Sequence, residues 1–186
     1  GGPDKLSYED IPTPVIGPDE VLVKVKACAL NHLDIWIRQG NPAYPMPMPH
    51  VSGSDVAGVV EQVGAQADHV TVGQRVFISP GISCWKCEQC LAGRDNFCRS
   101  YSLLGAMMHG GYAEYVVAPA EALAAVPDSL RSADAAPLLC AGITTFNALR
   151  NTGAKPPETV AILGMGGLGH LGVQFAAKMG FNTVAI

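Results

Sequence analysis

The sequence has little charge and few aromatic rings. Of its 186 residues, 15% are Asp, Glu, Lys or Arg and 6% are Phe, Trp or Tyr. The twelve Lys and Arg residues are scattered, the formal net charge is −4, and no stripe combines basic with aromatic side chains. Surfaces that bind nucleic acid or anionic lipid carry clustered positive charge. We therefore expect neither nucleic acid nor a membrane surface as a partner.

A long uninterrupted apolar run is also absent. The most apolar stretch, residues 160–177, is broken by glycines and by His170 and Gln174, a pattern of turn and helix rather than of a membrane span. Internal repeats and low-complexity tracts are missing, so a solenoid and a disordered tail are not expected. Hydrophobic residues nevertheless make up 48% of the chain, enough for a buried core.

Four cysteines gather in one short segment, as Cys84, Cys87, Cys90 and Cys98. Thiolates at such short spacings are typical of a closed, tetrahedral structural zinc site, in which no position is left for a substrate. The first three spacings also suit an iron–sulfur cluster, but the fourth cysteine follows after seven residues and no proline comes next, unlike the bacterial ferredoxin pattern. Two disulfides are the remaining alternative, and the lack of a secretory signal argues against them.

The other two cysteines, Cys28 and Cys140, stand alone in apolar surroundings. A chain with four metal-binding thiols and two isolated ones indicates a reducing compartment. The expected location is the cytoplasm.

Short alternating segments bounded by Gly, Pro or Asp dominate the first part of the chain. Residues 20–30 alternate apolar and polar side chains and are rich in valine, which predicts a strand. The same pattern recurs at 56–64, 73–78 and 110–119. Strands of this length and spacing are typical of a β-rich barrel or sandwich.

The pattern changes after residue 125, because alanines at helical spacing follow Ser132. We therefore predict a β-rich domain over 1–125, with the cysteine lobe at 81–100 as an excursion from it, and a second domain that begins within 126–186.

A glycine turn identifies this second domain. A short apolar strand from Thr159 runs into Gly164-x-Gly166-x-x-Gly169 and then into an apolar helix that ends at Gly180. In a dinucleotide fold the first glycine allows the tight turn, the second admits the pyrophosphate and the third lets helix and strand pack closely. The pattern predicts NAD or NADP binding by Gly164, Gly166, Gly167, Leu168 and Gly169. A glycine-rich turn in another doubly wound protein is the alternative.

The second strand, at 181–186, ends the sequence. The residue that distinguishes NAD from NADP normally lies about 20 residues after the fingerprint, which falls beyond Ile186. One strand, one helix and a second strand cannot close a doubly wound sheet. We therefore expect the chain to be a fragment, and a homo-oligomer to form through the missing part of that domain.

The β-rich domain, cysteine lobe and glycine fingerprint occur in an order that resembles the medium-chain dehydrogenase/reductase superfamily, which includes the zinc-containing alcohol dehydrogenases and the quinone oxidoreductases. The resemblance covers essentially the whole chain. It implies a GroES-like catalytic domain followed by a Rossmann domain, a structural zinc on the four clustered cysteines, and a nicotinamide pocket lined by Thr144 in CAGITT.

The catalytic zinc of the alcohol dehydrogenases is held by two cysteines and a histidine, and the resemblance places Asn31, Ser54 and Cys140 at these positions. The Asn31 amide and the Ser54 hydroxyl are poor zinc ligands. Cys140 with the Asp55 carboxylate would give only two protein ligands, where a catalytic zinc normally has three. The positions that pass protons in that family carry Leu33 and Trp36 instead. The resemblance therefore implies an incomplete catalytic zinc site.

The segments LNHLD and GSDVAG are similar to those of the zinc-free quinone and enone reductases. That similarity implies that Asn31 donates a hydrogen bond near the reacting centre, that Ser54 and Asp55 shape the floor, and that His32 reaches a cofactor phosphate. For Asp34 we expect a structural cap rather than a catalytic base. Cys140 is either part of the catalytic site or a small core residue.

The sequence thus predicts an NAD(P)-dependent oxidoreductase that reduces a small quinone or activated unsaturated carbonyl and carries one structural zinc. A zinc-dependent alcohol dehydrogenase is the first alternative, because LLCAGITT and GMGGLGHLG resemble that branch more. A non-enzymatic, zinc-folded binding or structural domain is the second.

Overall fold

The structure is a computed structural model that describes residues 1–40, 42, 46 and 48–186. The chain divides into two compact units, residues 1–136 and 137–186. Each is described by itself. The domain boundary predicted near residue 125 stays a prediction; the segment that follows it packs on unit 1, where Val126, Ala135 and Ala136 form a small cluster with Ala57.

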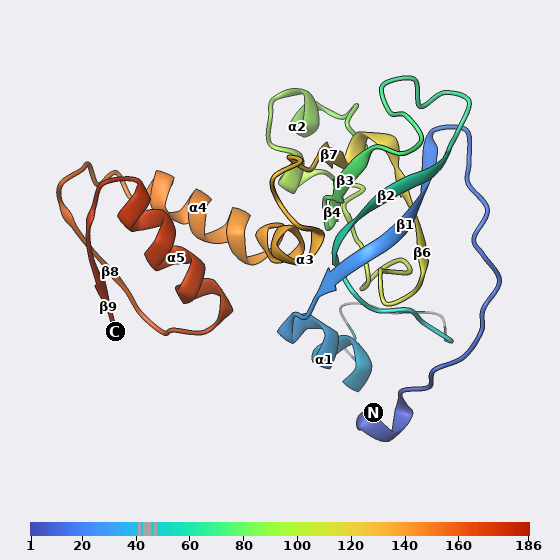
Figure 1. The fold of residues 1–186 in the computed structure, drawn as a ribbon, viewed down its shortest axis with the longest axis horizontal. Helices are drawn as coiled ribbons and strands as arrows, with labels where there is room; N and C mark the ends of the chain where they lie inside the picture. Colours follow the sequence, from blue (N-terminus) through green and yellow to red (C-terminus); the bar gives the residue numbers. More distant parts are fainter. Residues whose placement is uncertain (41, 43–45, 47) are drawn as a thin grey trace. The chain divides into compact units, whose positions relative to one another are not determined.

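Unit 1 is built on a five-stranded antiparallel sheet with the order β6-β1-β2-β3-β7 (Figure 1). Its strands are β1 (Glu20–Ala29), β2 (Asp55–Val63), β3 (Arg75–Ile78), β6 (Tyr115–Pro119) and β7 (Leu123–Ala125). The buried side chains are mostly valines, which β-strands favour because their branched Cβ packs well on a pleated surface. The central ones come from β1, β2 and β3: Val21, Val23, Val56, Val60, Val76 and Ile78.

The cysteine lobe leaves this sheet between β3 and β6. Its neck is the short antiparallel pair β4 (Gly81–Ile82) and β5 (Ser102–Leu103), and it contains α2 (Glu88–Leu91) and the 3₁₀ turn η2 (Asp95–Phe97). The partly buried Trp85 packs against the main core. The lobe is therefore anchored at its base, and its other turns have little apolar packing of their own.

Helix α1 (His32–Gln39) follows β1 directly. Unit 1 is completed by short helical segments: η1 (Pro3–Lys5), η3 (Ala120–Ala122), α3 (Ser132–Ala135) and the start of η4 (Ala136–Leu138).

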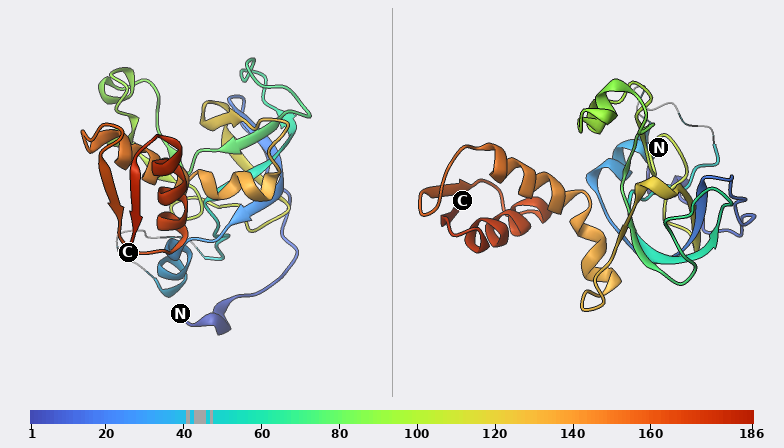
Figure 2. Two further views of the ribbon diagram at one scale, coloured as in Figure 1. Left: turned by 60° about the vertical axis from the view of Figure 1, so that its left-hand side comes forward. Right: turned by 90° about the horizontal axis from the view of Figure 1, so that it is seen from above.

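Unit 2 consists of α4 (Ala141–Asn151), β8 (Thr159–Ile162), α5 (Gly167–Lys178) and β9 (Asn182–Ala185), with β8 and β9 parallel. Helix α5 packs on both strands and on α4, as the views of Figure 2 show. A parallel strand–helix–strand unit with this glycine-rich first turn is the start of a dinucleotide-binding sheet. The predicted fold class, a β-rich domain followed by the start of an α/β domain, is confirmed.

Two details differ from the sequence-based prediction. The segment 110–119 is a strand only from Tyr115 onward, because its glycine-rich start forms a bend instead. The helical region after Ser132 is broken into α3, η4 and α4, since Pro137 lacks the N–H that a continuous helix needs. Across the described residues, no helix has the length and apolarity needed to cross a membrane.

Candidate functional site

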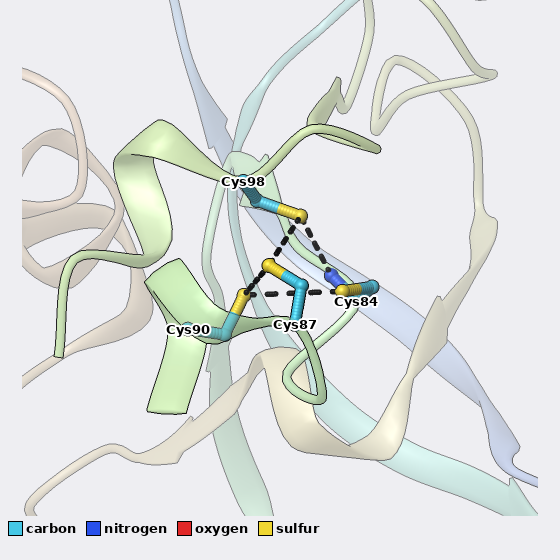
Figure 3. Close-up of side chains that lie close together, drawn as sticks. All are labelled: Cys84, Cys87, Cys90 and Cys98. Carbon is cyan, nitrogen blue, oxygen red and sulfur yellow. Dashed lines mark hydrogen bonds between the residues drawn. The ribbon is translucent and has the colours of Figure 1, made fainter. Parts of the chain in front are cut away.

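The four clustered cysteines converge on one point (Figure 3). Their sulfurs all lie within 4.8 Å of one another, with 3.5 Å between Cys87 and Cys90 and 4.0 Å between Cys87 and Cys98. Four sulfurs at about 2.3 Å from a tetrahedral Zn²⁺ lie about 3.8 Å apart. The observed spacings therefore fit a structural zinc held by Cys84, Cys87, Cys90 and Cys98.

Backbone N–H groups point at these sulfurs. The Cys84 N–H donates to Cys98 Sγ at 3.3 Å, and the Ser100 N–H donates to the same sulfur at 3.4 Å. Trp85 makes this wrapping possible with a left-handed backbone, φ 51°, which is uncommon outside glycine. The lobe is thus shaped to surround the metal.

The surroundings of Cys87 and Cys90 shift the pKa values of these two thiols in opposite directions. The pKa of Cys87 is lowered to about 6, first because the Cys90 N–H donates to its sulfur. The pKa of Cys90 is raised to about 12, mainly because burial disfavours its thiolate. Zinc binds thiolates, so a Zn²⁺ ion between the four sulfurs would offset the cost of ionising Cys90 and partly neutralise the negative charge of the thiolates.

The glycine turn of unit 2 has three distinct surroundings. Gly164 adopts φ +86°, which side chains rarely tolerate. A Cβ on Gly169 would lie 1.8 Å from the Gly164 carbonyl oxygen, whereas a Cβ on Gly166 or Gly167 would meet nothing within 4 Å. The backbone conformation therefore explains Gly164 and packing explains Gly169, but neither explains Gly166. The approach of a ligand to the backbone does explain it.

Gly166 is also the N-cap of α5 and has no side chain to satisfy the first N–H groups of that helix. Free donors and the positive end of the helix dipole suit a phosphate group. The segment Gly164–Gly169, with the half-exposed Leu168, is therefore shaped for the pyrophosphate of NAD or NADP.

A hydrogen-bonded cluster in unit 1 surrounds Asn31. Ala29 at the end of β1 pairs with Asp55 at the start of β2, which brings Asn31 next to Asp55, and the Asn31 Nδ2 donates to Asp55 Oδ2 at 2.9 Å. The Asn31 backbone N–H donates to Asp34 Oδ2 at 2.8 Å. Asp34 therefore caps α1, as predicted from the sequence.

The exposure of the predicted residues suggests how each can act. Asp55 and Ser54 are only 1% and 3% exposed, so they contact a ligand less readily than they support their neighbours. His32 is exposed at the first position of α1, and its ring meets Trp36 edge-on at 4.9 Å between centroids.

Two predicted residues belong to unit 2. Cys140 precedes α4 and Thr144 is exposed on its first turn, where the Thr144 N–H donates to the Cys140 carbonyl at 3.1 Å. Their assigned roles stay predictions.

The Asn31 cluster has two further members that sequence reasoning did not connect with it. Tyr112 was not singled out, and Cys28, expected to stand alone in apolar surroundings, lies close to the carboxylates of Asp34 and Asp55. The Tyr112 Oη donates to Asp34 Oδ2 at 2.6 Å. The pKa of Cys28 is raised to about 12, first by burial and then by the negative charges of Asp34 and Asp55. Both residues lie in segments that the strand pattern explained, so the sequence carried no separate signal for them.

Comparison with known proteins identifies the family of the chain. The family described as the alcohol dehydrogenase GroES-like domain matches residues 17–128. An alcohol dehydrogenase from Geobacillus stearothermophilus is 43% identical over 97% of this chain and 54% of its own length, and one from Schizosaccharomyces pombe is 38% identical over 100% and 54%.

Solved structures give the same result. An NAD-dependent alcohol dehydrogenase superposes with a TM-score of 0.90 at 40% identity, covering 100% of this chain and 55% of that one. A cobalt- and zinc-bound thermostable alcohol dehydrogenase from Pyrobaculum aerophilum gives 0.92 at 36%, covering 99% and 56%.

The chain spans a little over half the length of these relatives. The family match, the converging cysteines and the glycine turn together show that the chain belongs to the alcohol dehydrogenase GroES-like domain family of the medium-chain dehydrogenase/reductase superfamily.

Proposed function

We propose that the protein is an NAD(P)-dependent oxidoreductase that transfers hydride to a quinone or an activated, unsaturated carbonyl compound. Membership of a dehydrogenase family favours an enzyme over a purely structural zinc-folded domain. The observation that carries the finer proposal is the bond between the Asn31 amide and the buried Asp55 carboxylate.

By the resemblance described above, Asn31 and Ser54 stand at two of the positions that hold the catalytic metal in the alcohol dehydrogenases, and the bond joins Asn31 to Asp55, the neighbour of Ser54. Asn31 turns its amide nitrogen, which does not ligate zinc, toward Asp55, and Ser54 supplies only a hydroxyl. In the described part of the chain, the cysteine lobe is the one group of three or more His, Cys, Asp or Glu ligand atoms close enough to share a metal. Asn31, Ser54 and Asp55 therefore do not fit a catalytic zinc.

A quinone or enone carbon is already electrophilic, so its reduction needs positioning rather than a metal that polarises a carbonyl. The nicotinamide supplies the hydride when the cofactor is bound. The amides of Gly166–Gly169 hold its pyrophosphate, His32 reaches a phosphate and Thr144 lines the nicotinamide pocket. Asn31 donates its second N–H to the acceptor, with Ser54 and Asp55 supporting it, and Cys140 has a minor role.

Alcohol oxidation is the second candidate, because the similar curated and solved proteins above are alcohol dehydrogenases, one of them with zinc and cobalt bound. In that reaction Cys140 would be a zinc ligand, and the developing alkoxide would need the metal's charge.

Steady-state kinetics with a metal count separates the two. We expect one zinc per chain, NAD(P)H-dependent reduction of quinones or enones that exceeds oxidation of ethanol or benzyl alcohol, and activity that survives chelation. Asn31→Ala should lower kcat/KM by at least about 10-fold, because a hydrogen-bond donor at the reacting centre is lost, while Cys140→Ala should change it by less than about 3-fold.

Two tightly bound zinc ions per chain, together with alcohol oxidation that Cys140→Ala abolishes, would establish the alcohol dehydrogenase function instead.

A further inference from the structure

Tyr112 connects a distant loop to the residue that we propose as the substrate's hydrogen-bond donor. Its hydroxyl donates to Asp34 Oδ2 at 2.6 Å, and the same oxygen accepts the backbone N–H of Asn31 at 2.8 Å. One carboxylate oxygen therefore holds both the loop at residue 112 and the start of α1. Bonds to an ionised acceptor are roughly twice as strong as bonds between neutral groups.

The orientation of the Asn31 side chain follows from its partner. The NH₂ end of the amide faces Asp55, and Asn31 Nδ2 donates to Asp55 Oδ2 at 2.9 Å. One N–H is sufficient for this bond, and the other can be offered to a ligand. Asn31 is thus held at two points, by Asp34 through its backbone and by Asp55 through its side chain.

The Tyr112 ring is held in place without its hydroxyl. The Tyr112 N–H donates to the Ser52 carbonyl at 3.0 Å, and the Gly111 N–H donates to the Gly53 carbonyl at 2.7 Å. A Cβ on Gly53 would lie 2.8 Å from Tyr112 Cδ1, and one on Gly111 would lie 2.2 Å from Val56 Cγ2. The backbone hydrogen bonds and these close glycine contacts therefore fix the position of the ring. The hydroxyl is not needed for this and donates to Asp34.

Together these contacts point to Tyr112 as a positioning residue for Asn31 that acts through Asp34; this inference rests on the proposed reductase function of Asn31. Without the hydroxyl, the Asp34 carboxylate can rotate, its bond to the Asn31 N–H weakens, and the amide loses its alignment. Burial and the bond to Asp34 raise the pKa of Tyr112, so the phenol remains a protonated donor. Tyr112 is 40% exposed, and a bond at such a site contributes little to global stability.

The kinetic test compares Tyr112→Phe with Tyr115→Phe in the protein assayed for quinone and enone reduction. Tyr115 is a matched control, since its ring lies by Lys24 and its hydroxyl takes no part in the Asp34 bonds. Tyr112→Phe should lower kcat about 10-fold with KM changed less than about 2-fold, because misalignment affects the reaction step more than binding. Tyr115→Phe should leave both unchanged.

A double-mutant cycle checks the route through Asp34. Asp34→Ala, which removes the shared acceptor, should lower kcat on its own, and adding Tyr112→Phe to it should have little further effect, because the two residues act as one unit. A wild-type kcat for Tyr112→Phe, or fully additive losses in the double variant, would overturn the inference.

A second readout does not depend on activity. In ¹⁵N–¹H spectra, Tyr112→Phe should shift the backbone and side-chain amide signals of Asn31, whereas Tyr115→Phe should not. If no quinone or enone is reduced by the wild type, the proposed function fails, and the spectra still decide the positioning role. Unchanged Asn31 signals in Tyr112→Phe would refute it.

Discussion

Gly166 and Gly169 stand three positions apart in one turn but meet different surroundings. A Cβ on Gly166 points into open space, and a Cβ on Gly169 would collide with the Gly164 carbonyl oxygen. Only Gly169 is required by the packing of the described chain. Gly166 is explained by a ligand that lies against the backbone.

Alanine substitutions should separate these two requirements. Gly166→Ala should change the free energy of unfolding by less than about 1 kcal/mol yet weaken NADH or NADPH binding by at least about 10-fold, because the methyl group blocks the pyrophosphate. Gly169→Ala should lower the thermal midpoint clearly. Nicotinamide fluorescence measures cofactor binding, and thermal unfolding measures stability. Undiminished cofactor binding by Gly166→Ala would contradict the dinucleotide site.

At the scale of elements, the cysteine lobe is a segment folded around its ligands. Its regular structure is limited to the two-residue strands β4 and β5, the short helix α2 and the turn η2, and none of the residues of α2 and η2 is buried. A segment with so little apolar packing needs another source of folding energy, and a bound structural zinc supplies it.

Replacing one ligand should therefore unfold the lobe alone. We expect Cys87→Ser to reduce bound zinc from one per chain to nearly none, and to speed hydrogen exchange within residues 81–100, while unit 2 keeps its protection. Cys140→Ser is the control and should retain the zinc. Elemental analysis with hydrogen-exchange mass spectrometry tests this. A Cys87→Ser protein that kept its metal would mean that the ligands are assigned wrongly.

For the whole molecule, the Cys28 thiol in the Asn31 cluster makes stability depend on pH. The pKa of the Cys28 thiol is raised from near 9 to about 12, first by burial. Above pH 9 the unfolded chain loses this proton while the folded chain retains it, so ionisation favours the unfolded state. The stabilisation is fully present below pH 9 and is lost between pH 9 and 12.

Unfolding by urea at pH 8 and at pH 10.5, with zinc present, should show this loss. We expect the free energy of unfolding to fall less with pH in Cys28→Ser than in the wild type, because the hydroxyl does not ionise in this range. The same pH dependence in Cys28→Ser and wild type would rule out this account.

Local patterns alone were enough to predict the fold class, which the structure confirms, and two of the candidate sites. Valine-rich alternation predicts the strands because side chains on a strand alternate between faces, and the spacing of Cys84 to Cys98 predicts a metal site because the ligands come from one short segment. The glycine fingerprint is local as well, since strand, turn and helix follow one another in the chain. The positions in the catalytic region came from the resemblance rather than from any local pattern.

Tertiary structure alone decided how the residues around Asn31 are connected. Asn31, Asp55 and Tyr112 lie far apart in the sequence. Asn31 bonds to Asp55 directly and is linked to Tyr112 through Asp34, because the pairing of β1 with β2 and the bond from the Gly111 N–H to the Gly53 carbonyl bring three segments together. The same packing determines that Asp55 is buried and that Gly166 is open while Gly169 is crowded. Hydrogen bonds and steric contacts between distant segments depend on the positions of all the atoms around them. Sequence periodicity and residue spacing do not determine these positions.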